Sequence, residues 1–294
     1  MEQYYKASGN FSPLSFLLWF AVAIIALPIL AVIYAYAIWY IPIPYLNFFI
    51  TGIFGLLIGF VISNFVIRIG KVRNGKLALI FALFGALTAL YIHWAVWVDL
   101  AFNITGTVGG DKIGVATSNI KIMEVIALIT NPADLFGKMD LINMIGVWGI
   151  KGGTVKGGFL TFIWVIEFII VTLIATFSAS SQASKPFCEQ DDSWYDENEL
   201  TPKAAFQDAQ AFVKALSSGD MKVLDELLKP AGDIKTEHHS KFKLFDSKNG
   251  DNFVSVTNEI AKKTDKGELK FESQNITSFL KISQAVADRL KVTS

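Results

Sequence analysis

Two long apolar runs separated by a short basic turn dominate the first hundred residues. The runs extend from Phe48 to Ile67 and from Leu77 to Val98. Each is long enough to cross the hydrocarbon core of a bilayer, which takes about 20 residues of helix. The turn between them, residues 68–76, contains four lysine or arginine side chains. Because short loops rich in these cations stay on the cytoplasmic side, the turn predicts the orientation of the whole chain.

Two further apolar runs, residues 14–41 and 159–177, are also long enough to span. Together with residues 48–67 and 77–98 they predict four transmembrane helices. Pro28 interrupts the first run and removes one backbone hydrogen bond, so we expect that helix to be kinked or loosened there.

With the basic turn inside, four spans place both termini in the cytoplasm and residues 100–158 outside. This external segment contains five lysines, which by themselves favour the opposite orientation. They are spread along a long segment and mixed with acidic residues, whereas the rule weighs dense charge in short loops, so the turn outweighs them. Within the segment, Asp134 is placed to cap a helix through about Ile145 that lies on the membrane or over the mouth of the bundle.

The charges of the chain gather after the last span. We expect a membrane domain over residues 1–184, an acidic linker over 185–199 and a cytoplasmic α+β domain over 200–294. The elements expected in that domain are helices at 201–216 and 221–228, strands at 241–246, 253–260 and 268–273, and a last helix capped by Thr277 or Ser278 with an apolar stripe of Phe279, Ile282, Val286 and Leu290. The predicted fold class is therefore a membrane α-helical bundle of four transmembrane helices followed by a small soluble α+β domain with an antiparallel sheet.

The composition excludes several functions. The 26 basic and 26 acidic residues balance, so there is no basic patch typical of a nucleic-acid-binding protein. The single cysteine, Cys188, excludes an intramolecular disulfide framework and a cysteine-rich zinc site. We find no nucleophile–base pair or dinucleotide loop. We therefore assign no catalytic residue, metal site or cofactor, and the sequence favours a non-enzymatic protein without deciding the point.

Three ionisable residues at the membrane-spanning runs form a candidate polar site: His93, Asp99 and Glu167. Such residues are costly in a bilayer and therefore call for a reason. His93 and Glu167 lie at depths that agree to within about one helical turn at 1.5 Å per residue, so they can pair if their helices are neighbours. We favour a structural latch, and a proton or ion relay that adds Asp99 and a ligand-binding site remain alternatives.

Small residues give the second span one smooth face. Gly52, Gly55 and Gly59 are spaced three and four apart, which allows another helix to approach closely. The third span offers Ala82, Gly85 or Ala86, and Ala89 as a matching seam. We interpret the glycines as helix-packing residues.

Three functions stay open at this point. The leading one is a non-enzymatic scaffold or sensor whose cytoplasmic domain binds a protein partner. The first alternative is a small proton- or ion-coupled transporter or channel that uses His93, Asp99 and Glu167. The second is a membrane enzyme that acts on lipid or envelope substrates. The expected partners are the lipid bilayer and a protein, not a nucleic acid, and an oligomer is possible.

Four aromatic-rich segments carry a resemblance. Residues 34–40 (YAYAIWY), 89–98 (ALYIHWAVWV), 146–149 (GVWG) and 164–167 (WVIE) together resemble a family of bacterial, Bacteroidota-like multi-pass inner-membrane proteins of unknown function. The resemblance covers mainly residues 1–200. It implies a location in the bacterial inner (plasma) membrane and a multi-pass architecture, and it implies no chemistry.

Overall fold

A computed structural model describes residues 4–41, 43–110, 113–146, 148–150, 153–200, 204–205, 208–227, 237–264 and 268–292. The chain divides into two compact units. The membrane unit is Gly9–Ser184, and the soluble unit is Lys185–Ser294 together with the described residues before Gly9. The sequence prediction places residues 1–184 in the membrane domain and residues 185–199 in a linker.

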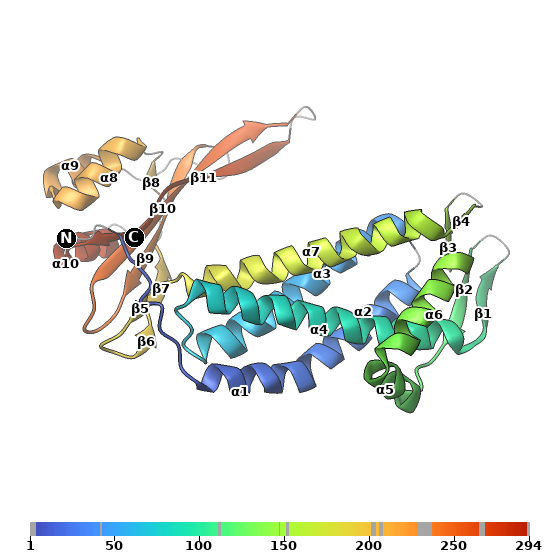
Figure 1. Cartoon of the computed structure of the whole chain (residues 1–294). Coiled ribbons are helices and arrows are strands. Elements are labelled where there is room, and N and C mark those ends of the chain that lie inside the picture. Colours follow the sequence, from blue (N-terminus) through green and yellow to red (C-terminus); the bar gives the residue numbers. More distant parts are fainter. Residues whose placement is uncertain are drawn as a thin grey trace. The chain divides into compact units, whose positions relative to one another are not determined.

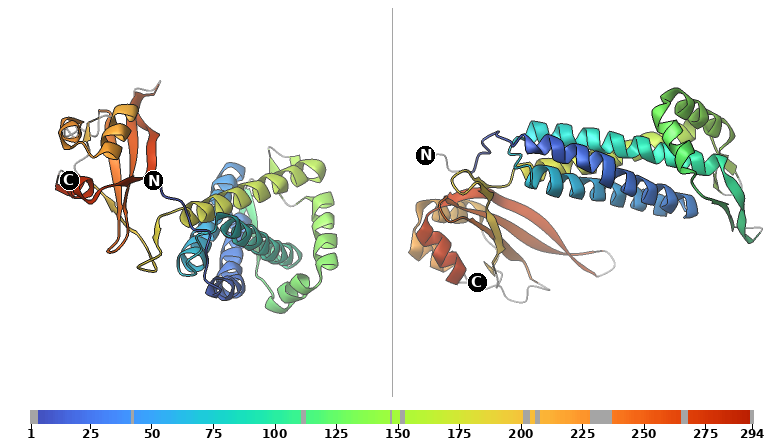
Figure 2. Two further views of the ribbon diagram at one scale, coloured as in Figure 1. Left: turned by 60° about the vertical axis from the view of Figure 1, so that its left-hand side comes forward. Right: turned by 90° about the horizontal axis from the view of Figure 1, so that it is seen from below.

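Among the residues that the structure describes, four helices of the membrane unit are long and apolar enough to cross a membrane, as predicted. The first span consists of α1 (Leu14–Ala21), the π-helical turn η1 (Val22–Ala26) and α2 (Leu27–Tyr40). The others are α3 (Pro44–Val61) with the π-helical η2 (Ile62–Arg68), α4 (Gly75–Phe102) and α7 (Gly157–Ala183). They lie side by side in the views of Figures 1 and 2. Side chains that face away from the bundle, such as Leu17, Ile24 and Phe177, are apolar and largely exposed, which suits contact with lipid.

The π-helical turn in the first span explains how the chain accommodates Pro28. In an α-helix the proline ring clashes with the carbonyl four residues earlier, here that of Ile24. The N–H of Leu27 reaches back five residues to the carbonyl of Val22, which widens the turn just before the proline. The helix therefore loosens without breaking.

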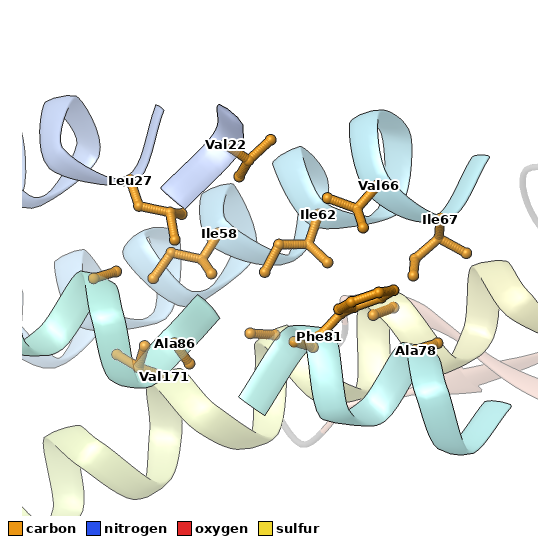
Figure 3. Close-up of a cluster of buried hydrophobic side chains, with 14 of the residues drawn as sticks. Val22, Leu27, Ile58, Ile62, Val66, Ile67, Ala78, Phe81, Ala86 and Val171 are labelled. Carbon is orange, nitrogen blue, oxygen red and sulfur yellow. The ribbon is translucent and has the colours of Figure 1, made fainter. Parts of the chain in front are cut away.

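Small side chains let the spans approach one another. A Cβ added at Gly55 would lie 3.1 Å from Cα of Val171, and one added at Gly59 would lie 2.7 Å from Cβ of Ser178. Both glycines thus face α7, so the prediction that they match the seam on the third span was wrong. A different face of the same span packs on α4. Figure 3 shows this contact, in which isoleucines of α3 and η2 point at alanines and Phe81 of α4.

The segment between α4 and α7 is folded. It contains the hairpin β1 (Ile104–Gly110) and β2 (Ile113–Ser118), the helices α5 (Ile122–Thr130) and α6 (Pro132–Ile145), and the hairpin β3 (Trp148–Ile150) and β4 (Gly153–Val155). The predicted helix through Ile145 is confirmed, but its cap is Asn131, whose side chain accepts a hydrogen bond from the N–H of Asp134.

The soluble unit is an antiparallel sheet with helices, in the strand order β11-β10-β9-β7, and β8 also pairs with β9. Its elements are β5 (Phe187–Cys188), β6 (Ser193–Trp194), β7 (Asp196–Glu199), β8 (Ala204–Ala205), α8 (Ala209–Ser218), α9 (Met221–Leu227), β9 (His239–Asp246), β10 (Asn252–Lys263), β11 (Leu269–Ile282) and α10 (Gln284–Val292). Phe212, Leu216 and Leu224 of the helices pack on Phe242, Leu244 and Val256 of the sheet to form its core.

Three elements differ from the sequence prediction. The acidic segment supplies strand β7 of the main sheet. The first helix begins at Ala209, where Asp208 caps it, and the predicted start at Thr201 lies outside the described residues. The last helix begins at Gln284, because Phe279 and Ile282 belong to β11, where pairing with β10 continues to Ile282. The predicted cap at Thr277 or Ser278 was therefore wrong.

The first described residues belong to the sheet of the soluble unit. Tyr4 forms a β-bridge with Leu280, and the N–H of Tyr5 donates to the carbonyl of Phe279 at 2.9 Å. The Tyr5 ring meets that of Phe253 edge-on at 5.4 Å. The segment before the first span is thus fixed to the domain that follows the last one.

Candidate functional site

A cluster of polar side chains lies inside the membrane unit, with one residue from each spanning helix. Tyr34 comes from α2, Thr51 from α3, His93 from α4 and Glu167 from α7, and all four are buried. The predicted contact between the helices of the third and fourth runs is present, because His93 Nε2 lies 3.5 Å from Glu167 Oε1. The cluster therefore links every span of the bundle.

The oxygen atoms of this cluster form a chain. Tyr34 Oη lies 2.6 Å from Glu167 Oε1 and 2.7 Å from Thr51 Oγ1, and Thr51 Oγ1 lies 2.8 Å from the carbonyl oxygen of Asn47. These three contacts need three protons, and the two hydroxyl groups supply two. If Glu167 is ionised, Tyr34 donates to it and one contact further along has no proton. If Glu167 carries the third proton, every contact in the chain has one.

His93 sits against aromatic rings rather than hydrogen-bond acceptors. Its ring centroid lies 4.6 Å from that of Tyr34 and 5.4 Å from that of Trp94. Although the 3.5 Å approach to Glu167 is within ion-pair distance, neither ring nitrogen has a hydrogen-bond partner among the described residues. The contact therefore holds the two groups together without a well-aligned hydrogen bond.

Asp99 belongs to a second set of contacts at the end of α4. Its carboxylate accepts hydrogen bonds from the N–H of Lys121 at 2.8 Å and from the Asn103 side chain at 2.9 Å. Lys121 precedes α5, so Asp99 fixes the start of that helix to the end of α4. Asn103 also bonds to Glu124 and lowers the pKa of that carboxyl, with Lys121 adding to the effect.

A cavity of about 150 Å³ lies beside Asp99, between α4, α5 and α6. Its polar lining comes from Asp99, Glu124, Asp134 and Lys138, and the Lys138 ammonium pairs with Asp134 at 3.1 Å. Within the described ranges, no three side chains of the types that ligate metals converge on one point.

Sequence reasoning missed Tyr34 and Thr51. Both are hydroxyl-bearing residues inside apolar runs, and that was the available signal. What the sequence lacked was their rotation about each helix axis, which decides whether a hydroxyl faces lipid or the bundle.

Comparison of the chain with models of protein families, with curated proteins and with solved structures finds no match. The resemblance to a family of inner-membrane proteins therefore stays a prediction.

Proposed function

We propose that this chain is a multi-pass protein of the bacterial inner membrane that acts as a non-enzymatic scaffold or sensor, with a cytoplasmic soluble unit that binds a protein partner. The observation that supports this proposal most is that the soluble unit is built from both ends of the chain. Residues before the first span and residues after the last belong to the same unit. Both ends must then lie on one side of the membrane, which an even number of spans satisfies.

The basic turn supports the cytoplasmic side. The N–H of Arg73 donates to the carbonyl of Asn10 at 2.8 Å, and the N–H of Ser12 donates to that of Gly70 at 3.2 Å. The turn thus adjoins the start of the first span, at the end of the bundle where the chain enters. Because dense cations in a short loop stay in the cytoplasm, we place this end and the soluble unit there.

The polar cluster supports a structural rather than a transporting role. A protonated Glu167 carries no charge, completes the oxygen chain and links α7 to α2 and α3. Such a neutral latch avoids the cost of a charge among membrane helices.

Co-purification tests the scaffold. We would isolate the tagged full chain from native membranes in a mild detergent and identify bound proteins by mass spectrometry. The matched control is the same chain ended after Ser184, which keeps the spans and lacks most of the soluble unit. We expect at least one protein retained by the full chain and absent from the control, and identical bound sets would contradict the proposal.

A proton-coupled transporter is the second candidate. Its supporting observation is that His93, which has no hydrogen-bond partner among the described residues, lies beside Glu167 in the bundle. Proton flux into liposomes that contain the full chain distinguishes the two. The scaffold predicts the flux of empty liposomes, whereas flux that Glu167→Gln abolishes would favour the transporter.

A further inference from the structure

The hairpin of β10 and β11 extends beyond the rest of its sheet (Figure 1). Strand β9 pairs with β10 only as far as His239 opposite Glu259. Beyond that point β10 and β11 continue as a ribbon, and every residue of β11 from Lys270 to Asn275 is exposed. On one face of this ribbon the Phe271 ring meets that of His239 edge-on at 5.2 Å. A two-stranded ribbon is marginally stable by itself, so this part of the sheet is suited to gain a strand.

The backbone groups on the outer edge of β11 are available for pairing. The N–H of Thr264 donates to the carbonyl of Glu268 at 2.8 Å, so the main-chain groups of Glu268 face β10. These groups alternate along an antiparallel strand, so those of Leu269, Phe271 and Ser273 face the opposite side. No described strand pairs with them there.

On the other edge of the ribbon, formed by β10, a backbone donor is already bonded to a side chain. On β10, the N–H of Ala261 donates to Nδ1 of His238 at 2.9 Å, so a side chain occupies that donor. At the far end of β11, the outer edge already holds an extended segment, because Tyr5 bonds to Phe279. The stretch around Phe271 is therefore the part of this edge left open among the described residues.

The side chains around Phe271 would complement the same side chains on a second, antiparallel copy of the strand. Lys270 and Glu272 lie on one face of the strand and Phe271, 37% exposed, on the other. If two copies of β11 pair antiparallel about a two-fold axis at Phe271, each Lys270 lies opposite Glu272 of the second copy, and the two phenylalanines lie opposite each other. Like charges at these positions would repel, whereas this sequence gives two attractive pairs and an aromatic pair.

We propose that Leu269–Ser273 of β11 pairs antiparallel with the same segment of a second copy, which joins two soluble units into one continuous sheet. The self-complementary charges favour a second copy over an unrelated strand. Anchoring in a membrane also raises the effective concentration of one copy near another. The proposal concerns the soluble unit and does not require the scaffold role to be correct.

Charge reversal tests the pairing in the full chain in detergent, with mass distributions measured by analytical ultracentrifugation over a range of concentrations. Lys270→Glu and Glu272→Lys each place like charges opposite each other twice. We expect each variant alone to raise the dimer dissociation constant about tenfold. An equimolar mixture of the two restores opposite charges at both positions, so we expect dimers that contain one copy of each.

Two results would overturn the proposal: a wild-type chain that stays monomeric at every concentration, or variants that dimerise as well as the wild type. Glu272→Lys also removes the ion pair with Lys262 within the ribbon, whereas Lys270→Glu retains it. Lys270 lies opposite Lys262 on β10, so Lys270→Glu also changes a contact within the ribbon. Thermal unfolding of each variant checks that the fold is intact.

Cross-linking tests the register. Phe271→Cys places two thiols on residues whose Cα atoms are about 5.5 Å apart, within the range of a disulfide. Gln274→Cys, exposed on the same strand, is the matched control, because its thiols would lie about 20 Å apart in this register. The wild-type Cys188 is buried and controls for background. Cross-linking of Gln274→Cys at the rate of Phe271→Cys or faster would contradict the register.

Discussion

At the scale of single residues, the polar cluster is best understood by counting its protons. Tyr34 and Thr51 connect the Glu167 carboxyl to a backbone carbonyl of α3 through three short contacts. A carboxyl group that carries a proton gives each contact a donor, whereas a carboxylate leaves one without. An amide and a hydrocarbon side chain at position 167 should therefore affect stability differently.

Glu167→Gln should therefore be well tolerated, because an amide at this position can accept a hydrogen bond from the Tyr34 hydroxyl, as Glu167 Oε1 does, and can also donate one. Glu167→Leu leaves the Tyr34 hydroxyl without this partner, and we expect it to cost about 1–3 kcal/mol of stability. Thermal stability in detergent measures both. The double variant Tyr34→Phe with Glu167→Leu, compared with the two single variants, measures the interaction energy between the two residues. A loss of stability equal to the sum of the single losses would show that they do not interact.

The glycines of α3 allow a comparison within one helix. A Cβ added at Gly59 would lie 2.7 Å from Cβ of Ser178, whereas nothing lies within 4 Å of one added at Gly52. Gly59→Ala should thus force α3 and α7 apart and cost about 1–3 kcal/mol, as overpacking does. Gly52→Ala is the matched control, with an expected change below about 0.5 kcal/mol. Equal melting temperatures for the two variants would contradict this packing.

Glu197 of β7 predicts a pH dependence of the soluble unit. Partial burial by itself would raise the pKa of this carboxyl, but hydrogen bonds and ion pairs with Lys185 and Lys243 outweigh burial and hold the pKa below its usual value. A lowered pKa in the folded state means that the stabilisation is present above the ordinary carboxyl pKa and is lost as pH falls through the lowered one.

We therefore expect fragment 185–294 to lose less stability between pH 7 and pH 3 when it carries Glu197→Gln than when it does not. Urea unfolding at each pH measures this. Glu226→Gln, which removes an exposed carboxyl on α9, is the control, and a Glu197→Gln fragment with the pH dependence of the wild type would contradict the prediction.

At the scale of elements, the soluble unit depends on segments outside the domain that the sequence outlines. Strand β7 covers the edge of β9 from Asp246 to Lys243, and Tyr5 packs on Phe253 and Phe279. An element that covers a sheet edge hides backbone groups that would otherwise pair with other chains.

Fragment 200–294 lacks β7 and should therefore be less stable than 185–294 and more prone to aggregate. Denaturant unfolding and light scattering of the two purified fragments measure this difference. In the full chain, Tyr5→Ala should increase hydrogen exchange at the end of β11 near Phe279. Equal stability of both fragments would show that β7 contributes little.

At the scale of the whole molecule, the parity of the spans and the shared unit make one prediction about topology. Both ends of the chain should lie in the cytoplasm and the segment between α4 and α7 outside. A periplasm-active reporter fused after Ser294 should be inactive, and the same reporter inserted after Gly110, between β1 and β2, should be active. The reverse pattern would contradict the orientation by charge.

Much of the architecture follows from the sequence alone. Length and hydropathy are local properties, so the four spans can be read directly, and the spacing of Gly55 and Gly59 marks a face of close approach. Rise per residue also gives depth, which is why the contact between His93 and Glu167 could be predicted. Each of these inferences uses distances along one helix or between helix ends.

Tertiary structure decided the rest, because it depends on which elements are neighbours and how each is rotated. Gly55 and Gly59 face α7 rather than α4, Tyr34 and Thr51 turn toward Glu167 rather than lipid, and Asp99 fixes the start of α5. Pairing with β10 continues to Ile282 and keeps this residue in a strand, although its spacing from Val286 suits a helix. Tyr5 bonds to Phe279, which is 274 residues away in the chain. A local pattern does not name such a partner. The stability of a paired strand depends on the neighbours that it meets across the sheet, and these come from distant parts of the chain.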